Sequence, residues 1–126
     1  MATILIVDDE LGIVEEVKAF FEDEGHRVYT ADTGEDGIQF VEKIKPDVLL
    51  VDIKLPDLSG LRVLEASKRL SPKTKTIVIT GYVDQCIIDE AEKLGRDAFL
   101  QKPFNFDVLQ REVNRVLKIH HRTRPS

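Results

Sequence analysis

Five side chains able to do acid, metal or phosphate chemistry stand at or just after the ends of short apolar runs: Asp8, Asp9, Asp52, Thr80 and Lys102. The runs are rich in β-branched residues, which is typical of buried strands. A strand buried on both faces cannot hold a charge midway, but it can hold one at its carboxyl end, where it meets solvent. Because the carboxyl ends of parallel strands lie along one edge of a sheet, we expect the five side chains to converge there.

Such a group of side chains is suited to phosphoryl transfer. Three carboxylates repel one another unless a cation joins them or one stays protonated. Lys102 supplies one positive charge, and Mg²⁺, which prefers oxygen ligands, would supply the rest. A carboxylate nucleophile, a metal ion, a hydroxyl and a lysine are what phosphoryl transfer to an aspartate requires. Asp52 ends the most apolar run and is the predicted nucleophile.

Each residue taken singly also has an ordinary structural interpretation. An aspartate at a strand end is commonly a turn residue or a helix cap, and Asp9 has the right place to cap the helix that follows it. A lysine before proline usually faces solvent. Complementary groups at four strand ends favour one shared reacting centre over four separate structural roles.

The elements that must position these groups alternate along the chain. The sequence predicts strands at residues 3–7, 26–31, 47–52, 76–80 and 98–100. It predicts helices at residues 11–24, 33–45 and 60–70, a fourth between the cap Asp84 and Gly95, and a fifth after the cap Asn105. Right-handed crossovers then place helices on both faces of a parallel sheet. The second strand is the most polar and suits an edge, and the third is the most apolar and suits the centre. This favours an α/β, flavodoxin-like (βα)5 doubly wound parallel five-stranded sheet of order 2-1-3-4-5 over the Rossmann order.

The composition bounds the class of protein. At 126 residues, with 42% hydrophobic and 33% charged residues, the chain fits one globular domain. No apolar run approaches the ~20 residues of a membrane helix, and the net charge of −5 argues against direct binding of nucleic acid. Cys86 is the single cysteine, so a disulfide framework is excluded and a cytoplasmic location is expected. We expect Cys86 to be a packing residue and His26, His120 and His121 to be surface residues.

Four motifs at the predicted strand ends give the chain a family resemblance. They are IVDDE at residues 6–10, VDIKLPDLSG at 51–60, VITGY at 78–82 and QKPF at 101–104. From residue 4 to about residue 117 the chain resembles the receiver domain of two-component response regulators. We therefore expect a receiver domain at residues 1–120, followed by a short basic tail or the start of a linker at residues 121–126.

The resemblance implies a phosphoacceptor role for Asp52. It would take a phosphoryl group from a phosphohistidine on a sensor histidine kinase or phosphotransfer protein, with Mg²⁺ as cofactor. Asp9, Asp52 and the backbone carbonyl of Lys54 would bind Mg²⁺ directly, and Asp8 would act through water.

The resemblance also implies how the signal is held and passed on. Thr80 and Lys102 would hold the phosphoryl oxygens, and the peptide bond between Lys102 and Pro103 would be cis. Thr80 would move toward the phosphoryl group and Phe99 would turn inward into the vacated space. The face built by the fourth helix, fifth strand and fifth helix would then change shape for a downstream effector, for an output domain of the same protein, or for homodimer formation.

Two positions that vary in the family are occupied here by Lys54 and Tyr82. Both should overhang the phosphoryl group where a hydrolytic water must approach, so we expect this pair to lengthen the phosphoryl lifetime. Gly81 leaves room for small phosphoryl donors to enter.

Three other functions fit the sequence less well. An aspartate-nucleophile phosphatase needs a second aspartate two residues after the nucleophile, where this chain has Lys54. A flavin carrier needs a phosphate-binding loop after the first strand, where acidic residues would repel phosphate. A receiver-like domain used only for protein contact is disfavoured because every phosphorylation residue is present. A signalling module that is not an enzyme with an external substrate is the preferred interpretation.

Overall fold

The structure, a computed structural model, describes residues 1–81 and 84–118. In these two ranges five strands alternate with five helices, as predicted: β1 (Thr3–Val7), α1 (Leu11–Asp23), β2 (Arg27–Ala31), α2 (Gly34–Ile44), β3 (Val48–Asp52), α3 (Gly60–Leu70), β4 (Lys75–Thr80), α4 (Gln85–Lys93), β5 (Ala98–Gln101) and α5 (Phe106–Leu117). The predicted ends differ from these by no more than one residue. Such differences are expected, because the terminal turns and bridges of an element are its weakest.

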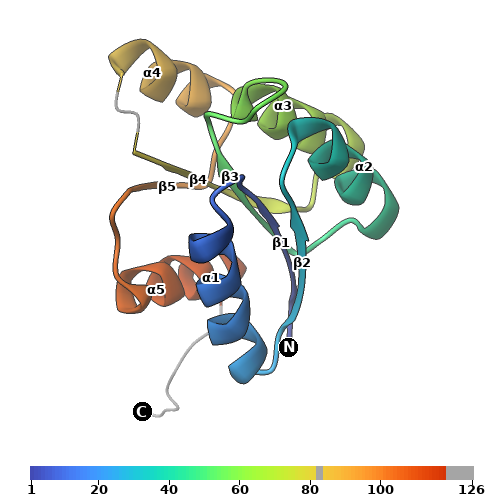
Figure 1. Cartoon of the computed structure of the whole chain (residues 1–126). Helices are drawn as coiled ribbons and strands as arrows, with labels where there is room; N and C mark the ends of the chain where they lie inside the picture. The colour runs from blue at the N-terminus through green and yellow to red at the C-terminus, as the bar shows by residue number, and fades with distance from the viewer. Residues whose placement is uncertain (82–83, 119–126) are drawn as a thin grey trace.

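The strands form one parallel sheet in the order β2-β1-β3-β4-β5, which confirms the predicted order (Figure 1). Register aligns the carboxyl ends of the central strands. Val7 lies opposite Val51, Asp52 opposite Ile79, and Thr80 opposite Gln101. Residues that follow these positions therefore emerge at one edge of the sheet.

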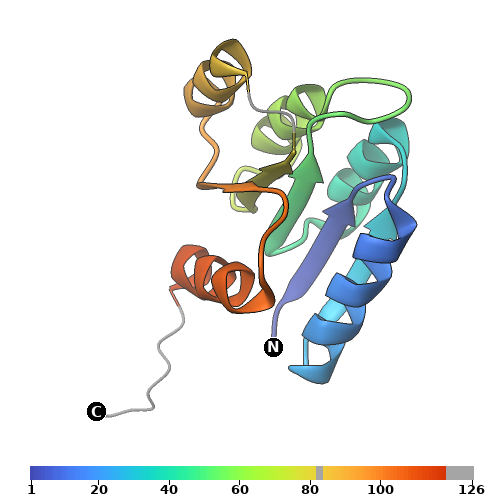
Figure 2. The same ribbon diagram turned by 60° about the vertical axis from the view of Figure 1, so that its left-hand side comes forward.

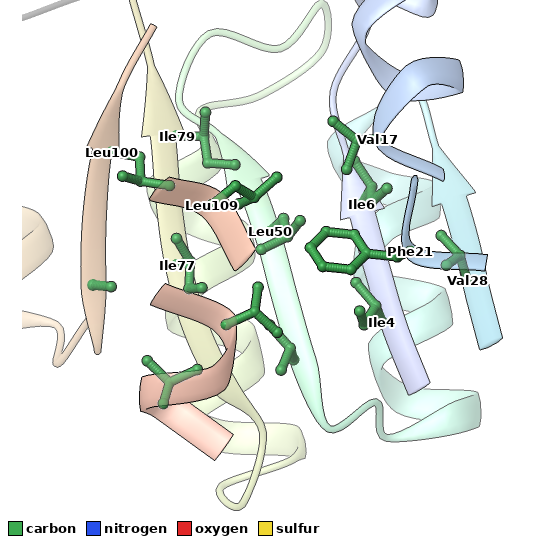
Figure 3. Close-up of a cluster of buried hydrophobic side chains, with 14 of the residues drawn as sticks. Ile4, Ile6, Val17, Phe21, Val28, Leu50, Ile77, Ile79, Leu100 and Leu109 are labelled. Carbon is green, nitrogen blue, oxygen red and sulfur yellow. The ribbon is translucent and has the colours of Figure 1, made fainter. Parts of the chain in front are cut away.

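The helices cover both faces of the sheet, with α1 and α5 on one side and α2, α3 and α4 on the other (Figure 2). Alternate residues of β1 point to opposite faces, so Ile4 and Ile6 join one buried cluster and Leu5 and Val7 join the other. Figure 3 shows the first cluster, in which Phe21 of α1 lies beside strand residues such as Leu50. All five residues of β3 are buried, as its apolar sequence predicts.

Polar side chains cap the amino ends of α4 and α5. Asp84 accepts a hydrogen bond from the Cys86 backbone N–H at 2.8 Å, and Asn105 accepts one from that of Val108 at 2.8 Å. Both predicted caps are confirmed. Within the described ranges, no helix combines the length and apolar character needed to cross a membrane.

Two smaller predictions need correction. Cys86 is exposed rather than packed, because the inward face of α4 is set by Ile87 and Ala91, and Cys86 falls outside it. His26 is half-buried rather than on the surface, and its Nδ1 accepts the backbone N–H of Ala2 at 3.0 Å. His120 and His121 lie outside the described residues.

Candidate functional site

A cavity of about 770 Å³ opens at the carboxyl ends of the central strands. It brings together residues from four separate strand ends and the loops after them: Asp9, Glu10, Ile13, Asp52, Lys54, Leu55, Pro56, Thr80, Gly81, Lys102 and Pro103. Its size is within the range of small-molecule sites. The convergence expected from the sequence is therefore present at one edge of the sheet.

The Lys102 ammonium lies at the centre of the charged groups. Its Nζ donates to Asp8 Oδ2 at 2.8 Å, to Asp52 Oδ2 at 3.0 Å, and to Glu10 Oε1. The Lys102, Asp8 and Asp52 side chains are only 10%, 7% and 8% exposed, whereas that of Glu10 is 55% exposed. Two nearly buried carboxylates and one half-exposed carboxylate thus share one cation. The Lys102–Pro103 peptide bond at the cavity rim is cis.

The loop after Asp52 is held tightly against the end of β3. The Gly60 N–H donates to the Ile53 carbonyl at 2.7 Å, and Lys54 forms an isolated antiparallel bridge with Ser59. A Cβ atom on Gly60 would lie 1.9 Å from the Asp52 carbonyl oxygen, so only glycine allows this approach. The Lys54 N–H also points back toward Asp52, at 3.4 Å from its Oδ1.

The electrostatics of the site follow from burial and from the excess of carboxylates. Burial raises the pKa of Asp8, and the nearby charge of Asp52 adds to this, although Lys102 and the Glu10 backbone N–H oppose it. Burial alone would lower the pKa of Lys102, but its hydrogen bonds to the three carboxylates outweigh this and raise it. Lys102 is therefore cationic at any physiological pH, and negative charge remains in excess around it.

This donor set fits a hard divalent cation. Asp8, Glu10 and Asp52 each offer a carboxylate oxygen, and these oxygens lie within 4.8 Å of one another. An oxygen-only set with excess negative charge and open space beside it suits Mg²⁺, which keeps several waters when bound. Asp9 lines the same cavity but is exposed and stands outside this close group.

Glu10 is the site residue that the sequence reasoning did not single out. The backbone at Glu10 is extended, with φ −87° and ψ 92°. In extended chain, residues two apart point to the same side, which agrees with the contacts that both Asp8 and Glu10 make with Lys102. That period of two across the acidic triplet was the signal available in the sequence.

Comparison with known proteins agrees with this geometry. Residues 4–114 match the response regulator receiver domain family. The chain belongs to this family. It is 32% identical over 116 residues to the sporulation initiation phosphotransferase F of Bacillus subtilis, a match that covers 92% of this chain and 94% of that protein. The crystal structure of a CheY-like response regulator receiver domain protein from Methanospirillum hungatei superposes with a TM-score of 0.92 at 35% identity, covering 94% of each chain.

Other relatives of the receiver domain are longer. The chain is also 32% identical over 116 residues to a cyclic di-GMP phosphodiesterase of Thermotoga maritima, where the match covers 92% of this chain and 31% of that protein. The phosphodiesterase activity belongs to that protein as a whole. What this receiver domain shares with it is the receiver segment alone.

The remaining predicted site residues differ in burial and in their position relative to the cavity. Thr80 is buried, at 1% exposure, and lines the cavity. Phe99 is half-buried on β5 and packs against the cluster that lies under α2, α3 and α4. Lys54 is exposed at the cavity rim. Tyr82 lies outside the described residues.

Proposed function

We propose that this receiver domain is a phosphorylation-dependent switch in which Asp52 is the phosphoacceptor. The observation that carries the proposal is the placement of the nearly buried Asp52 carboxylate within 3.0 Å of the Lys102 ammonium, in a cavity open to a donor. A carboxylate that faces both solvent and a fixed cation can attack phosphorus, and the cation can take up the charge that develops on the phosphoryl oxygens.

The reaction would proceed by in-line displacement. A carboxylate oxygen of Asp52 forms a bond to phosphorus as the bond from phosphorus to the donor's imidazole nitrogen breaks, and that nitrogen then takes a proton from water. Lys102 and Thr80 would hold the equatorial oxygens of the transferred group. Water attack on the same phosphorus later releases inorganic phosphate and restores the Asp52 carboxylate.

Mg²⁺, when bound, would neutralise carboxylate and phosphoryl charge at the site. We propose Asp9, Asp52 and the Lys54 carbonyl as its direct ligands, with Asp8 acting through water. The close group of Asp8, Glu10 and Asp52 oxygens supports a cation site here. The exposed position of Asp9 at the cavity wall leaves its side chain free to turn toward an ion.

The output would follow from Thr80 and Phe99. We propose that Thr80 shifts toward the phosphoryl group and that Phe99 turns inward beside it, which changes the surface formed by α4, β5 and α5. Thr80 is on β4 and Phe99 is on β5, and these two strands are adjacent in the sheet. Phosphorylation would bias this two-state element by giving Thr80 and Lys102 a new anionic partner.

The partners follow from the same mechanism. We propose a sensor histidine kinase or phosphotransfer protein as the donor, and an effector, an attached output domain or a second copy as the receiver of the signal. The proposed location is the cytoplasm, the proposed domain spans residues 1–120, and residues 121–126 are proposed as a tail or linker.

We propose no external substrate, because Lys54 stands where a phosphatase of this chemistry needs an acid.

Binding of beryllium trifluoride with Mg²⁺ tests the proposal without a kinase. This anion resembles a phosphoryl group bound to a carboxylate. In amide NMR spectra of the wild type, saturable shifts are expected around Asp52, Thr80 and Lys102. Asp52→Asn, which lacks the nucleophilic oxygen, should show none. Equal shifts in both proteins, or no saturable shift in the wild type, would contradict the assignment of Asp52.

A further inference from the structure

The loop that follows the proposed phosphoacceptor is hydrogen-bonded to the amino end of α2. Asp57, at the tip of this loop, accepts the backbone N–H of Gly34 on Oδ1 at 2.8 Å and that of Glu35 on Oδ2 at 2.9 Å. Gly34 and Glu35 are the first two residues of α2. One carboxylate thus satisfies two of the backbone N–H groups that a helix leaves without partners at its amino end. In Figure 2 the loop after β3 reaches over to the start of α2.

Apolar packing reinforces this contact. Gly34 is buried, and a Cβ atom there would lie 2.5 Å from Leu58 Cδ1. The Leu58 side chain therefore packs directly on the backbone of α2 at Gly34, and a larger residue there would push Leu58 aside. The Leu58 N–H also donates to Asp57 Oδ1 at 2.9 Å, so the loop tip is folded around the same carboxylate.

The base of the loop lies directly beside the Asp52 carboxylate. Lys54 is bridged to Ser59 across the base of the loop, and the Gly60 N–H is bound to the Ile53 carbonyl. A loop closed at its base and held at its tip has little freedom left. Leu55 and Leu58 pack against the buried cluster on this face. Pro56 and Asp57 between them are exposed, so the hydrogen bonds of Asp57 to α2 are the polar contact that holds the tip.

We propose that Asp57 is a positioning residue for the metal site. By binding the amino end of α2, it holds the loop in the conformation that places the Lys54 backbone beside the Asp52 carboxylate, with the Lys54 nitrogen 3.4 Å from Asp52 Oδ1. The inference rests on the proposed function, since it assumes that the Lys54 carbonyl binds Mg²⁺. It goes beyond that function by making Mg²⁺ affinity depend on an exposed residue that touches neither the ion nor the phosphoryl group.

Electrostatics agree with a carboxylate at this position. The backbone N–H groups of Glu35 and Gly34 hold the pKa of Asp57 below its ordinary value, so it is ionised wherever the domain is folded near neutral pH. An asparagine would lose one of the two acceptor oxygens and turn an N–H donor toward another N–H donor. Asp57→Asn therefore loosens the contact with minimal change in size.

Three variants separate positioning from simple helix capping. Asp57→Asn weakens the contact from the loop, and Gly34→Ala weakens it from the helix by displacing Leu58. Asp36→Asn is the control, because it removes the same charge from the first turn of α2 at an exposed side chain outside the loop contact. For each, the Mg²⁺ dissociation constant is measured by titrating MgCl₂ into the full chain and following amide NMR shifts, and the unfolding temperature is measured without Mg²⁺.

The expected result is a Mg²⁺ dissociation constant about tenfold higher in Asp57→Asn, the lower end of the effect seen when groups supporting a metal ligand are removed. Gly34→Ala should raise it in the same direction, and Asp36→Asn should leave it at the wild-type value. A lower unfolding temperature with unchanged Mg²⁺ affinity in both test variants would overturn the inference and leave Asp57 as a helix cap. Absence of saturable Mg²⁺ shifts in the wild type would overturn the proposed function itself, and with it the inference.

Discussion

Replacing Lys102 with methionine is the most revealing perturbation of the site's electrostatics. The change keeps an unbranched side chain one atom shorter but removes the ammonium shared by Asp8 and Asp52, whose side chains are 7% and 8% exposed. Removing one partner of a buried ion pair costs about 3–5 kcal/mol. Because these carboxylates border an open cavity and one of them can take up a proton, we expect a smaller loss, about 2 kcal/mol, below that range. For a domain of this size the unfolding temperature should fall by about 6–10 °C.

The dependence of this loss on pH and Mg²⁺ identifies its cause. The pKa of Asp8 is already raised by burial, and without Lys102 it must rise further. A carboxyl group whose pKa is higher in the folded than in the unfolded state stabilises the folded state as pH falls. The deficit, meaning the stability that Lys102→Met loses relative to the wild type, should therefore shrink from pH 7 downward. Mg²⁺ should shrink it as well, because the carboxylates released from Lys102 should bind the ion more tightly than in the wild type, and an ion at ten times its dissociation constant adds about 1.4 kcal/mol of stability.

Differential scanning calorimetry at several pH values, with and without MgCl₂, measures these effects. Lys68→Met is the matched control, because Lys68 forms a half-exposed ion pair with Asp97 at 3.5 Å away from the cavity. It should lose less than about 1 kcal/mol, with no dependence on Mg²⁺. A Lys102→Met deficit that is absent, or that stays constant across pH and Mg²⁺ concentration, would refute this account of the charges.

Three further outcomes are expected. Asp8→Asn should raise the free energy of unfolding at pH 7 without Mg²⁺, measured by urea titration, because burial raises the pKa of this carboxyl and penalises its charge; a lower value would contradict this. Lys54→Ala combined with Tyr82→Ala should shorten the phosphoryl lifetime several-fold, measured as phosphate release, because shielding from water is lost; an equal or longer lifetime would exclude the shielding role. Burial, and after it the charge of the N-terminal amine, lowers the pKa of His26. The neutral imidazole therefore stabilises the folded state at pH values above the ordinary pKa of histidine. This stabilisation should be lost as pH falls, when His26 takes up a proton and its Nδ1 no longer accepts the Ala2 N–H. His26→Gln should reduce that part of the pH dependence in urea titrations at pH 7 and 5, and an unchanged dependence would argue against it.

The sheet order and the convergence of the charged residues were predictable from local patterns. The apolar sequence of β3 required a central position, and a central parallel strand can end in a carboxylate only at the open edge. The register then carries Asp52, Thr80 and Lys102 to that edge without further information.

The contacts that tune the site were not predictable from local patterns. Asp57 and Gly34 are 23 residues apart, and they meet only because α2 and the loop before α3 pack on the same face of the sheet. Glu10 joined the site because the chain stays extended for one residue beyond the acidic pair.

Intact mass spectrometry after incubation with acetyl phosphate and Mg²⁺ tests the central claim most directly. The wild type should gain the mass of one phosphoryl group, and the gain should disappear when Mg²⁺ is removed with a chelator. Asp52→Asn should gain none, while the control variant Asp36→Asn should match the wild type. An equal gain in wild type and Asp52→Asn would show that Asp52 is not the phosphoacceptor.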